Sequence, residues 1–219
     1  MPSSDADNTG GTIAAGTDAV RRRAAWIGIA VLAALIVVGL ASGGAPRVTE
    51  GRVLVVGDSL TNGSNAAVRS ALTDAGWEAV VDGRGGWSIG RWREPLVQLA
   101  NFARPDVAIV ALGTNNCDRT CRRLDPEIDG IIETLLDAGA QEIYWVNVQE
   151  SAAYPADPAT VNDAIARAVV RWPQVRLIDL DAAFDGHPEW HGGVGDPHFN
   201  EAGAQQFGAL LVKALAARP

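Results

Sequence analysis

The sequence has 219 residues, 47% of them apolar, and a formal net charge of −8. This length fits one main domain with additional segments, and the apolar content is enough for a sizeable core. The acidic balance argues against nucleic-acid binding, because that binding depends on lysine and arginine side chains that neutralise phosphates. The Walker phosphate-binding pattern and the H-E-x-x-H zinc pattern are both absent, so we expect neither a cofactor nor a metal.

The N-terminal part of the chain differs in composition from the rest. Residues 1–20 are rich in Ser, Asp, Asn, Thr and Gly, and with the basic triplet that follows they are expected to form a disordered cytoplasmic tail, 1–23. Residues 24–41 carry no charge, and as a helix they would span ~27 Å, close to the ~30 Å of a bilayer core. This segment is either a transmembrane anchor or a cleaved signal peptide with small residues at 41–45. Its length, beyond the usual ~7–15 apolar residues of a signal peptide, favours the anchor.

Both interpretations place the rest of the chain outside the cytoplasm, because basic residues beside an apolar segment stay on the cytoplasmic side. We therefore expect a single-pass cell-membrane protein with an extracytoplasmic domain, or a secreted protein if the segment is cleaved. Residues 42–51 are expected to form a linker, and residues 52–219 the main domain, which we expect to be monomeric.

Short apolar runs alternate with helical patterns through the main domain. Strands are expected at 53–56, 77–81, 106–112, 142–148 and 175–180, and helices at 65–75, 89–102, 126–138, 159–171 and 200–217. The run 106–112 is the most continuously apolar, which predicts a central strand. Alternation of strand and helix predicts a five-stranded parallel sheet between two helical layers, a flavodoxin-like three-layer α/β/α fold.

The candidate functional residues follow the predicted strands or precede the last helix. In parallel sheets of this kind, ligands bind beyond the carboxyl ends of the strands. The segments found there contain Ser59, Gly86, Asn115, Asp196 and His198. A serine hydroxyl, an imidazole, a carboxylate and fixed N–H donors are the groups that acyl transfer from an ester requires. Each residue also has a simpler interpretation; Ser59, for example, would cap the helix that follows it.

Four motifs in this chain order resemble the SGNH hydrolases, the GDSL esterase/lipase family, over roughly residues 52–216. They are Gly57-Asp58-Ser59-Leu60, the segment DGRGGWS at 82–88, Gly113-Thr114-Asn115-Asn116 and Asp196-Pro197-His198. The resemblance implies that Ser59 is the nucleophile, His198 its base and Asp196 the acid that orients the base. It also implies an oxyanion hole formed by the backbone N–H groups of Ser59 and Gly86 and the side-chain amide of Asn115.

The sequence departs from the family pattern at two positions. The last motif is usually D-x-x-H but here reads D-x-H, which shortens the reach of Asp196. Asp185, Glu189 or a Ser–His dyad without an acid are the alternatives. The third motif usually reads G-x-N-D, and Asn116 replaces its acid, which we expect to affect loop structure more than chemistry. Within the second motif, Gly83 and Gly85 are alternatives to Gly86.

The two cysteines, Cys117 and Cys121, directly follow the third motif. In an exported domain they are expected to form a disulfide, because two thiols alone lack the further ligands of a metal site. The chain-entropy model gives such a small loop about 2 kcal/mol of stabilisation. The bond would also stiffen the loop that carries Asn115.

These features together predict an exported serine ester hydrolase that cleaves acyl or acetyl esters, carbohydrate or small lipid esters, through an acyl-enzyme on Ser59. Two alternatives stay open. One is an O-acyltransferase that uses the same residues on cell-envelope glycans. The other is a non-catalytic glycan- or partner-binding module, which the short D-x-H spacing would favour. Trp87, Trp92 and Trp190 lie in or near the motifs. They would stack on a sugar, line an acyl pocket, or serve core packing and loop anchoring, and the last of these is favoured.

Overall fold

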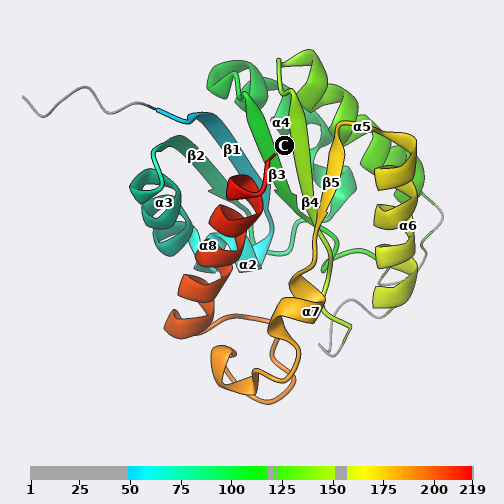
Figure 1. Cartoon of the computed structure of the whole chain (residues 1–219). Coiled ribbons are helices and arrows are strands. Elements are labelled where there is room, and N and C mark those ends of the chain that lie inside the picture. The colour runs from blue at the N-terminus through cyan, green and yellow to red at the C-terminus, as the bar shows by residue number, and fades with distance from the viewer. Residues whose placement is uncertain (1–48, 118–120, 122, 151–156, 219) are drawn as a thin grey trace, which may run out of the picture. The chain divides into compact units, whose positions relative to one another are not determined.

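The computed structural model describes residues 49–117, 121, 123–150 and 157–218 (Figure 1). The predicted tail 1–23, the apolar segment 24–41 and most of the linker 42–51 lie outside these ranges. Within them, no helix is both long and apolar enough to cross a bilayer.

The core of the domain is one parallel sheet of five strands in the order β2-β1-β3-β4-β5. The strands are β1 (Gly51–Gly57), β2 (Trp77–Gly83), β3 (Val107–Ala111), β4 (Glu142–Val146) and β5 (Val175–Ile178). All neighbouring pairs are parallel. The central strand is β3, and all of its residues are buried, as its apolar run predicts. This order is the flavodoxin-like one, so the predicted fold is confirmed.

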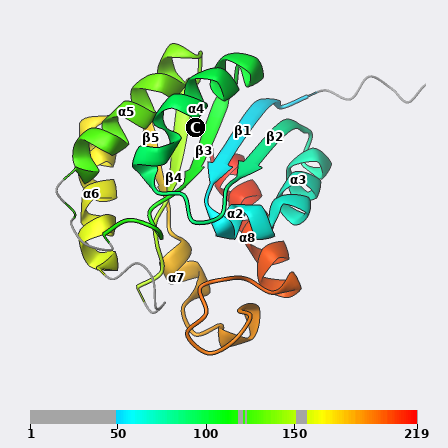
Figure 2. The ribbon, with the colours of Figure 1, turned by 180° about the vertical axis from the view of Figure 1, so that it is seen from behind.

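Helices cover both faces of the sheet. They are α2 (Ser59–Gly63), α3 (Asn65–Asp74), α4 (Ile89–Ala103), α5 (Leu124–Asp137), α6 (Pro158–Arg171), α7 (Leu180–Phe184) and α8 (Glu201–Ala216), with a 3₁₀ turn η1 (Pro188–Trp190). In Figure 1, α3 and α8 lie in front of the sheet; Figure 2 shows α4 and α5 on the opposite face. Alternate residues of β1 serve the two layers, because successive strand side chains point to opposite faces. Leu54 and Val56 pack toward α4, α5 and α6, and Val53 and Val55 toward α3 and α8.

The predicted strands 142–148 and 175–180 extend two residues beyond the ends of β4 and β5 in the structure. In each case the side chain that follows the strand explains the difference. β4 ends at Val146 because Asn147 turns its side chain to accept the N–H groups of Leu180 (2.6 Å) and Asp181 (3.1 Å). β5 ends at Ile178 because Asp179 caps α7, accepting the N–H of Ala182 at 3.0 Å. The elements α2, α7 and η1 were not expected, since three to five residues are too few to show helical periodicity.

The register places the ends of three strands side by side. Gly57 at the end of β1 pairs with Gly83 of β2 and with Ala111 of β3. A side-chain carbon at Gly57 would overlap Thr61, and one at Gly83 would overlap the backbone of α2. Glycine at both positions therefore lets α2 sit directly on the strand ends. In both views the segment between α7 and α8 lies at this same end of the sheet (Figures 1 and 2).

Candidate active site

The turn after β1 presents the hydroxyl of Ser59. Asp58, not Ser59, caps α2, because Asp58 Oδ1 accepts the backbone N–H of Leu60 at 3.0 Å. The capping interpretation of Ser59 is therefore wrong. Ser59 is the first residue of α2, and its Oγ lies 3.0 Å from Nε2 of His198, which is 139 residues away in sequence.

The acid of the site reaches the histidine despite the D-x-H spacing. Oδ1 of Asp196 lies 2.7 Å from Nδ1 of His198 and accepts the backbone N–H of His198 at 2.9 Å. That N–H, and then the imidazole, hold the pKa of Asp196 below its usual value, so the carboxylate is ionised at neutral pH. Of the alternative acids, Glu189 pairs instead with Nδ1 of His187 at 2.8 Å, and Asp185 ends α7. The structure thus brings Ser59, His198 and Asp196 into one hydrogen-bonded chain.

The loop that carries His198 is fixed by Asn200. The side-chain amide of Asn200 donates to the carbonyls of Glu189 (2.7 Å) and His191 (3.0 Å), while its Oδ1 caps α8 through the N–H of Gly203 (3.0 Å). Sequence reasoning missed this role. The available signal was an asparagine directly before the last helix, a favoured capping position.

The predicted oxyanion-hole residues follow β2 and β3, the two neighbours of β1. Gly86 has φ of +71°, a left-handed conformation that favours glycine, whereas Gly83 is the last residue of β2 and packs under α2. The side-chain amide of Asn115 donates to the carbonyl of Trp87 at 3.3 Å. This bond uses only one of the two amide hydrogens of Asn115.

Asn116, which replaces the usual acid of the third motif, acts on loop structure as expected. Its Oδ1 accepts the N–H of Ile89, the first residue of α4, at 3.1 Å. Ser88, at the capping position of that helix, makes no side-chain capping bond itself. The third motif therefore caps a helix that begins in the second motif.

Comparison with known families decides the assignment. The model of the GDSL-like lipase/acylhydrolase family matches residues 55–206, more than half of the chain. The chain belongs to the GDSL-like lipase/acylhydrolase family. It is an enzyme of the GDSL acylhydrolase type, and the resemblance drawn from the four motifs is confirmed. A search of curated protein sequences finds no match.

Solved structures similar to this GDSL domain include esterases and an acetyltransferase domain. The C-terminal catalytic domain of peptidoglycan O-acetyltransferase A from Streptococcus pneumoniae is 21% identical, with a TM-score of 0.59 over 75% of this chain and 92% of that one. A carbohydrate esterase family 3 protein from Talaromyces cellulolyticus is 19% identical, with a TM-score of 0.63 over 75% and 95% of the two chains. The lipase/acylhydrolase from Enterococcus faecalis is 18% identical, with a TM-score of 0.62 over 75% and 95%. At these identities the likeness shows the fold alone.

The tryptophans near the candidate site make contacts with other residues of the same domain. Trp92 is fully buried, and its indole N–H donates to the carbonyl of Gly57 at 3.2 Å. The guanidinium of Arg84 lies over the rings of both Trp87 (4.5 Å) and Trp92 (4.6 Å). Trp190 stacks on the ring of His187 at 3.7 Å. These contacts agree with the packing interpretation.

Asp58 of the GDSL motif is fully buried and directly precedes Ser59, the candidate nucleophile. Burial raises the pKa of Asp58 to about 6, against opposing contributions from the N–H of Leu60, the hydroxyl of Thr114 and the charge of His198. The four motifs assign no role to Asp58. The structure gives it one, since it caps α2 and so fixes the backbone on which Ser59 sits.

Replacing Asp58 by asparagine should make stability depend less on pH. The native state holds the proton of Asp58 more tightly than the unfolded chain does. Protonation of Asp58 therefore stabilises the native state fully at low pH, and this contribution is lost as pH rises from 3.8 to about 6. The loss corresponds to about 3 kcal/mol. Asparagine keeps the capping oxygen, so Asp58→Asn should gain stability relative to wild type between pH 4 and pH 7. Urea unfolding followed by circular dichroism measures the difference.

Asp157→Asn is the matched control for that experiment. Asp157 also caps a helix, accepting the N–H of Thr160 at 3.1 Å, but it is exposed and its pKa is lowered by Thr160. Its stabilisation is present at neutral pH and is lost on acidification, so the variant should show the opposite trend. The same pH trend in both variants would contradict the interpretation of Asp58.

Proposed function

We propose that the chain is an exported serine esterase that hydrolyses acetyl or other short acyl esters, with carbohydrate esters as the main substrate class. The observation that carries the proposal is the hydrogen-bonded chain from Ser59 Oγ to His198 Nε2 (3.0 Å) and from His198 Nδ1 to Asp196 Oδ1 (2.7 Å). This arrangement activates a serine for attack on an ester carbonyl.

The chemistry follows from these contacts. His198 takes the proton of Ser59 as Oγ attacks the carbonyl carbon, and Asp196 stabilises the resulting imidazolium. The N–H groups of Ser59 and Gly86 and the amide of Asn115 are suited to bind the oxyanion. His198 then returns the proton to the departing alcohol, leaving the acyl group on Ser59. A water molecule, activated by the same imidazole, releases the acid.

The exposure of the triad supports short acyl groups on bulky alcohols. The side chain of His198 is 55% exposed and that of Asp196 41%. An open site of this kind admits an ester on a polysaccharide but gives little apolar cover to a long acyl chain. The structures of similar fold include a carbohydrate esterase, which agrees with this substrate class.

Acyl transfer to a glycan is the second candidate, favoured by the similarity to the catalytic domain of a peptidoglycan O-acetyltransferase. The two reactions share the acyl-enzyme and differ in whether water or a sugar hydroxyl accepts the acyl group. The D-x-H spacing no longer supports a non-catalytic module, because Asp196 Oδ1 lies 2.7 Å from His198 Nδ1 despite the short spacing.

One experiment separates the three candidates. The full chain is incubated with 4-nitrophenyl acetate, with and without a peptidoglycan oligosaccharide, and free acetate and acetylated sugar are counted against nitrophenol released. Hydrolysis predicts that acetate accounts for the nitrophenol in both reactions. Acetylated oligosaccharide as the main product would instead establish the transferase. Absence of catalysed nitrophenol release would refute both enzymes.

Export is proposed from the apolar segment 24–41 and from the Cys117–Cys121 disulfide, a bond typical of oxidising compartments. In a bacterial host, alkaline phosphatase fused after residue 219 should be active, and a fluorescent protein that folds only in the cytoplasm should stay dark. Deleting residues 24–41 is the control and should reverse both signals. A bright fluorescent fusion to the full chain would contradict export.

A further inference from the structure

The third motif holds the second motif in place at two points. The amide of Asn115 donates to the carbonyl of Trp87 at 3.3 Å, and Oδ1 of Asn116 accepts the N–H of Ile89 at 3.1 Å. Trp87 is the residue after Gly86. The position of Gly86 and the orientation of the Asn115 amide therefore depend on the same short loop.

This loop ends in a residue whose backbone conformation is disfavoured. Cys117 has φ of +61°, a left-handed conformation that residues other than glycine rarely adopt. Cys117 is 8% exposed and belongs to the core cluster that also contains Ile89 and Trp92. A residue in this conformation persists only where the surrounding structure holds it there.

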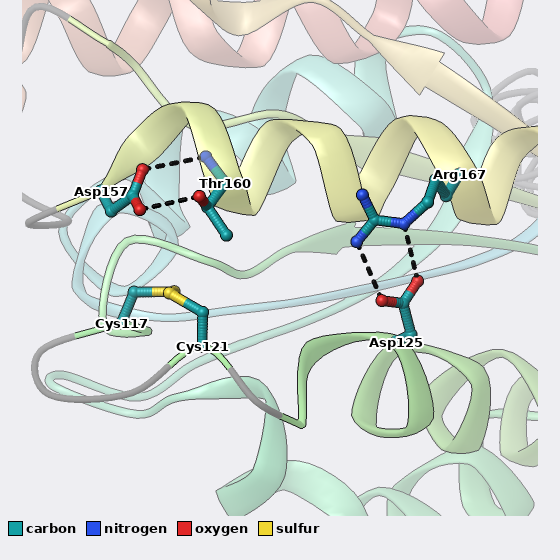
Figure 3. Close-up of a disulfide and its surroundings, with 6 residues drawn as sticks. All are labelled: Cys117, Cys121, Asp125, Asp157, Thr160 and Arg167. Atoms are coloured by element: carbon teal, nitrogen blue, oxygen red, sulfur yellow. Dashed lines mark hydrogen bonds and ion pairs between the residues drawn. A yellow bond between two sulfur atoms is a disulfide. The ribbon is translucent and has the colours of Figure 1, made fainter.

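A disulfide supplies that constraint and connects the loop to a fixed pair of helices. Cys117 is bonded to Cys121 (Figure 3). The carbonyl of Cys121 accepts the N–H of Leu124, at the start of α5, at 3.5 Å. The next residue, Asp125, pairs with Arg167 (2.9 Å) and Arg171 (3.0 Å) of α6. The disulfide thus anchors the end of the Asn115 loop to two helices joined by ion pairs.

We propose that the Cys117–Cys121 disulfide is a positioning device for Asn115, so that fast ester turnover requires the oxidised protein. The proposal rests on the proposed esterase function. Reduction by dithiothreitol breaks the S–S bond and gives two protonated thiols, while the dithiol is oxidised to its cyclic disulfide. Cys121 is partly exposed whereas Cys117 is buried, so we expect the dithiol to reach the bond from the side of Cys121. Release of Cys117 from its left-handed conformation would then displace Asn115.

The test compares oxidised and reduced full-length protein on 4-nitrophenyl acetate. Loss of a well-placed oxyanion donor should lower kcat by at least about tenfold, with KM changed by less than about twofold. Circular dichroism should show an unchanged fold, and reoxidation with glutathione disulfide should restore kcat. The double variant Cys117→Ala, Cys121→Ala should match the reduced protein and not respond to dithiothreitol.

Asn115→Ala shows whether the disulfide acts through Asn115. In this background the donor is already absent, so reduction should change kcat by less than about twofold. Reduction that slows Asn115→Ala as much as wild type, or that leaves wild type unchanged, overturns the inference and leaves the proposed function intact. An oxidised wild-type protein that releases no nitrophenol overturns both.

Discussion

Replacing Ser59 by alanine should abolish covalent labelling by a fluorophosphonate probe and lower kcat on 4-nitrophenyl acetate by roughly a millionfold, the loss typical of a serine nucleophile. The reason is that Ser59 Oγ, 3.0 Å from His198 Nε2, is the atom on which we propose that the acyl-enzyme forms. Intact-mass spectrometry of labelled protein and steady-state kinetics measure the two effects.

The fold should survive this substitution, because Asp58 and not Ser59 caps α2. The melting temperature of Ser59→Ala should therefore stay close to that of wild type, which separates loss of the nucleophile from unfolding. Labelling that persists in Ser59→Ala would show that another residue is the nucleophile and would refute the assignment.

Replacing Asp196 by asparagine should lower kcat by about ten-thousandfold, as loss of the triad carboxylate does in serine hydrolases of this mechanism. Asparagine has nearly the same shape, but it removes the charge that stabilises the imidazolium of His198. Its amide also no longer selects the tautomer with a proton on Nδ1. The KM and kcat of the purified variant on 4-nitrophenyl acetate give the effect directly.

Glu189→Gln is the matched control for Asp196→Asn. Glu189 lies in the same loop and pairs with a histidine at 2.8 Å, but that histidine is His187. Removing the charge of Glu189 should leave kcat within about twofold of wild type. Exposed ion pairs contribute little free energy, and this pair does not include His198. A variant at Glu189 that is as slow as Asp196→Asn, or an active Asp196→Asn enzyme, would move the acid role away from Asp196.

The order of elements in the domain could be predicted because each strand and long helix has its own periodicity. The central place of β3 followed from its unbroken apolar run, and the proximity of the candidate site residues followed because parallel strands end at one edge. What could not be predicted depends on contacts between distant segments. The capping of α4 by Asn116 joins residues 27 positions apart, and no local pattern reports it.

The conformation of the loop that carries Asp196 and His198 could not be predicted from the motif either. The D-x-H spacing suggested a carboxylate too close in sequence to reach the ring, since the family pattern has one more residue. In the structure a single oxygen of Asp196 accepts both the backbone N–H and the ring of His198. Motif spacing carries no information on this turn, because it depends on the rotamers of both side chains.

This shared oxygen divides the proposed triad into two parts that would respond differently to movement. Asp196 and His198 form a local unit, held together by bonds within one tripeptide, and a displacement of the loop carries both residues along without separating them. The contact between His198 and Ser59 joins two residues that are 139 positions apart in sequence, so a displacement of the loop would change the distance between them. A rigid-body displacement of the loop would therefore separate Ser59 from a His198–Asp196 pair that stays hydrogen-bonded, and the return of the loop would restore the Ser59 contact to the whole pair at once.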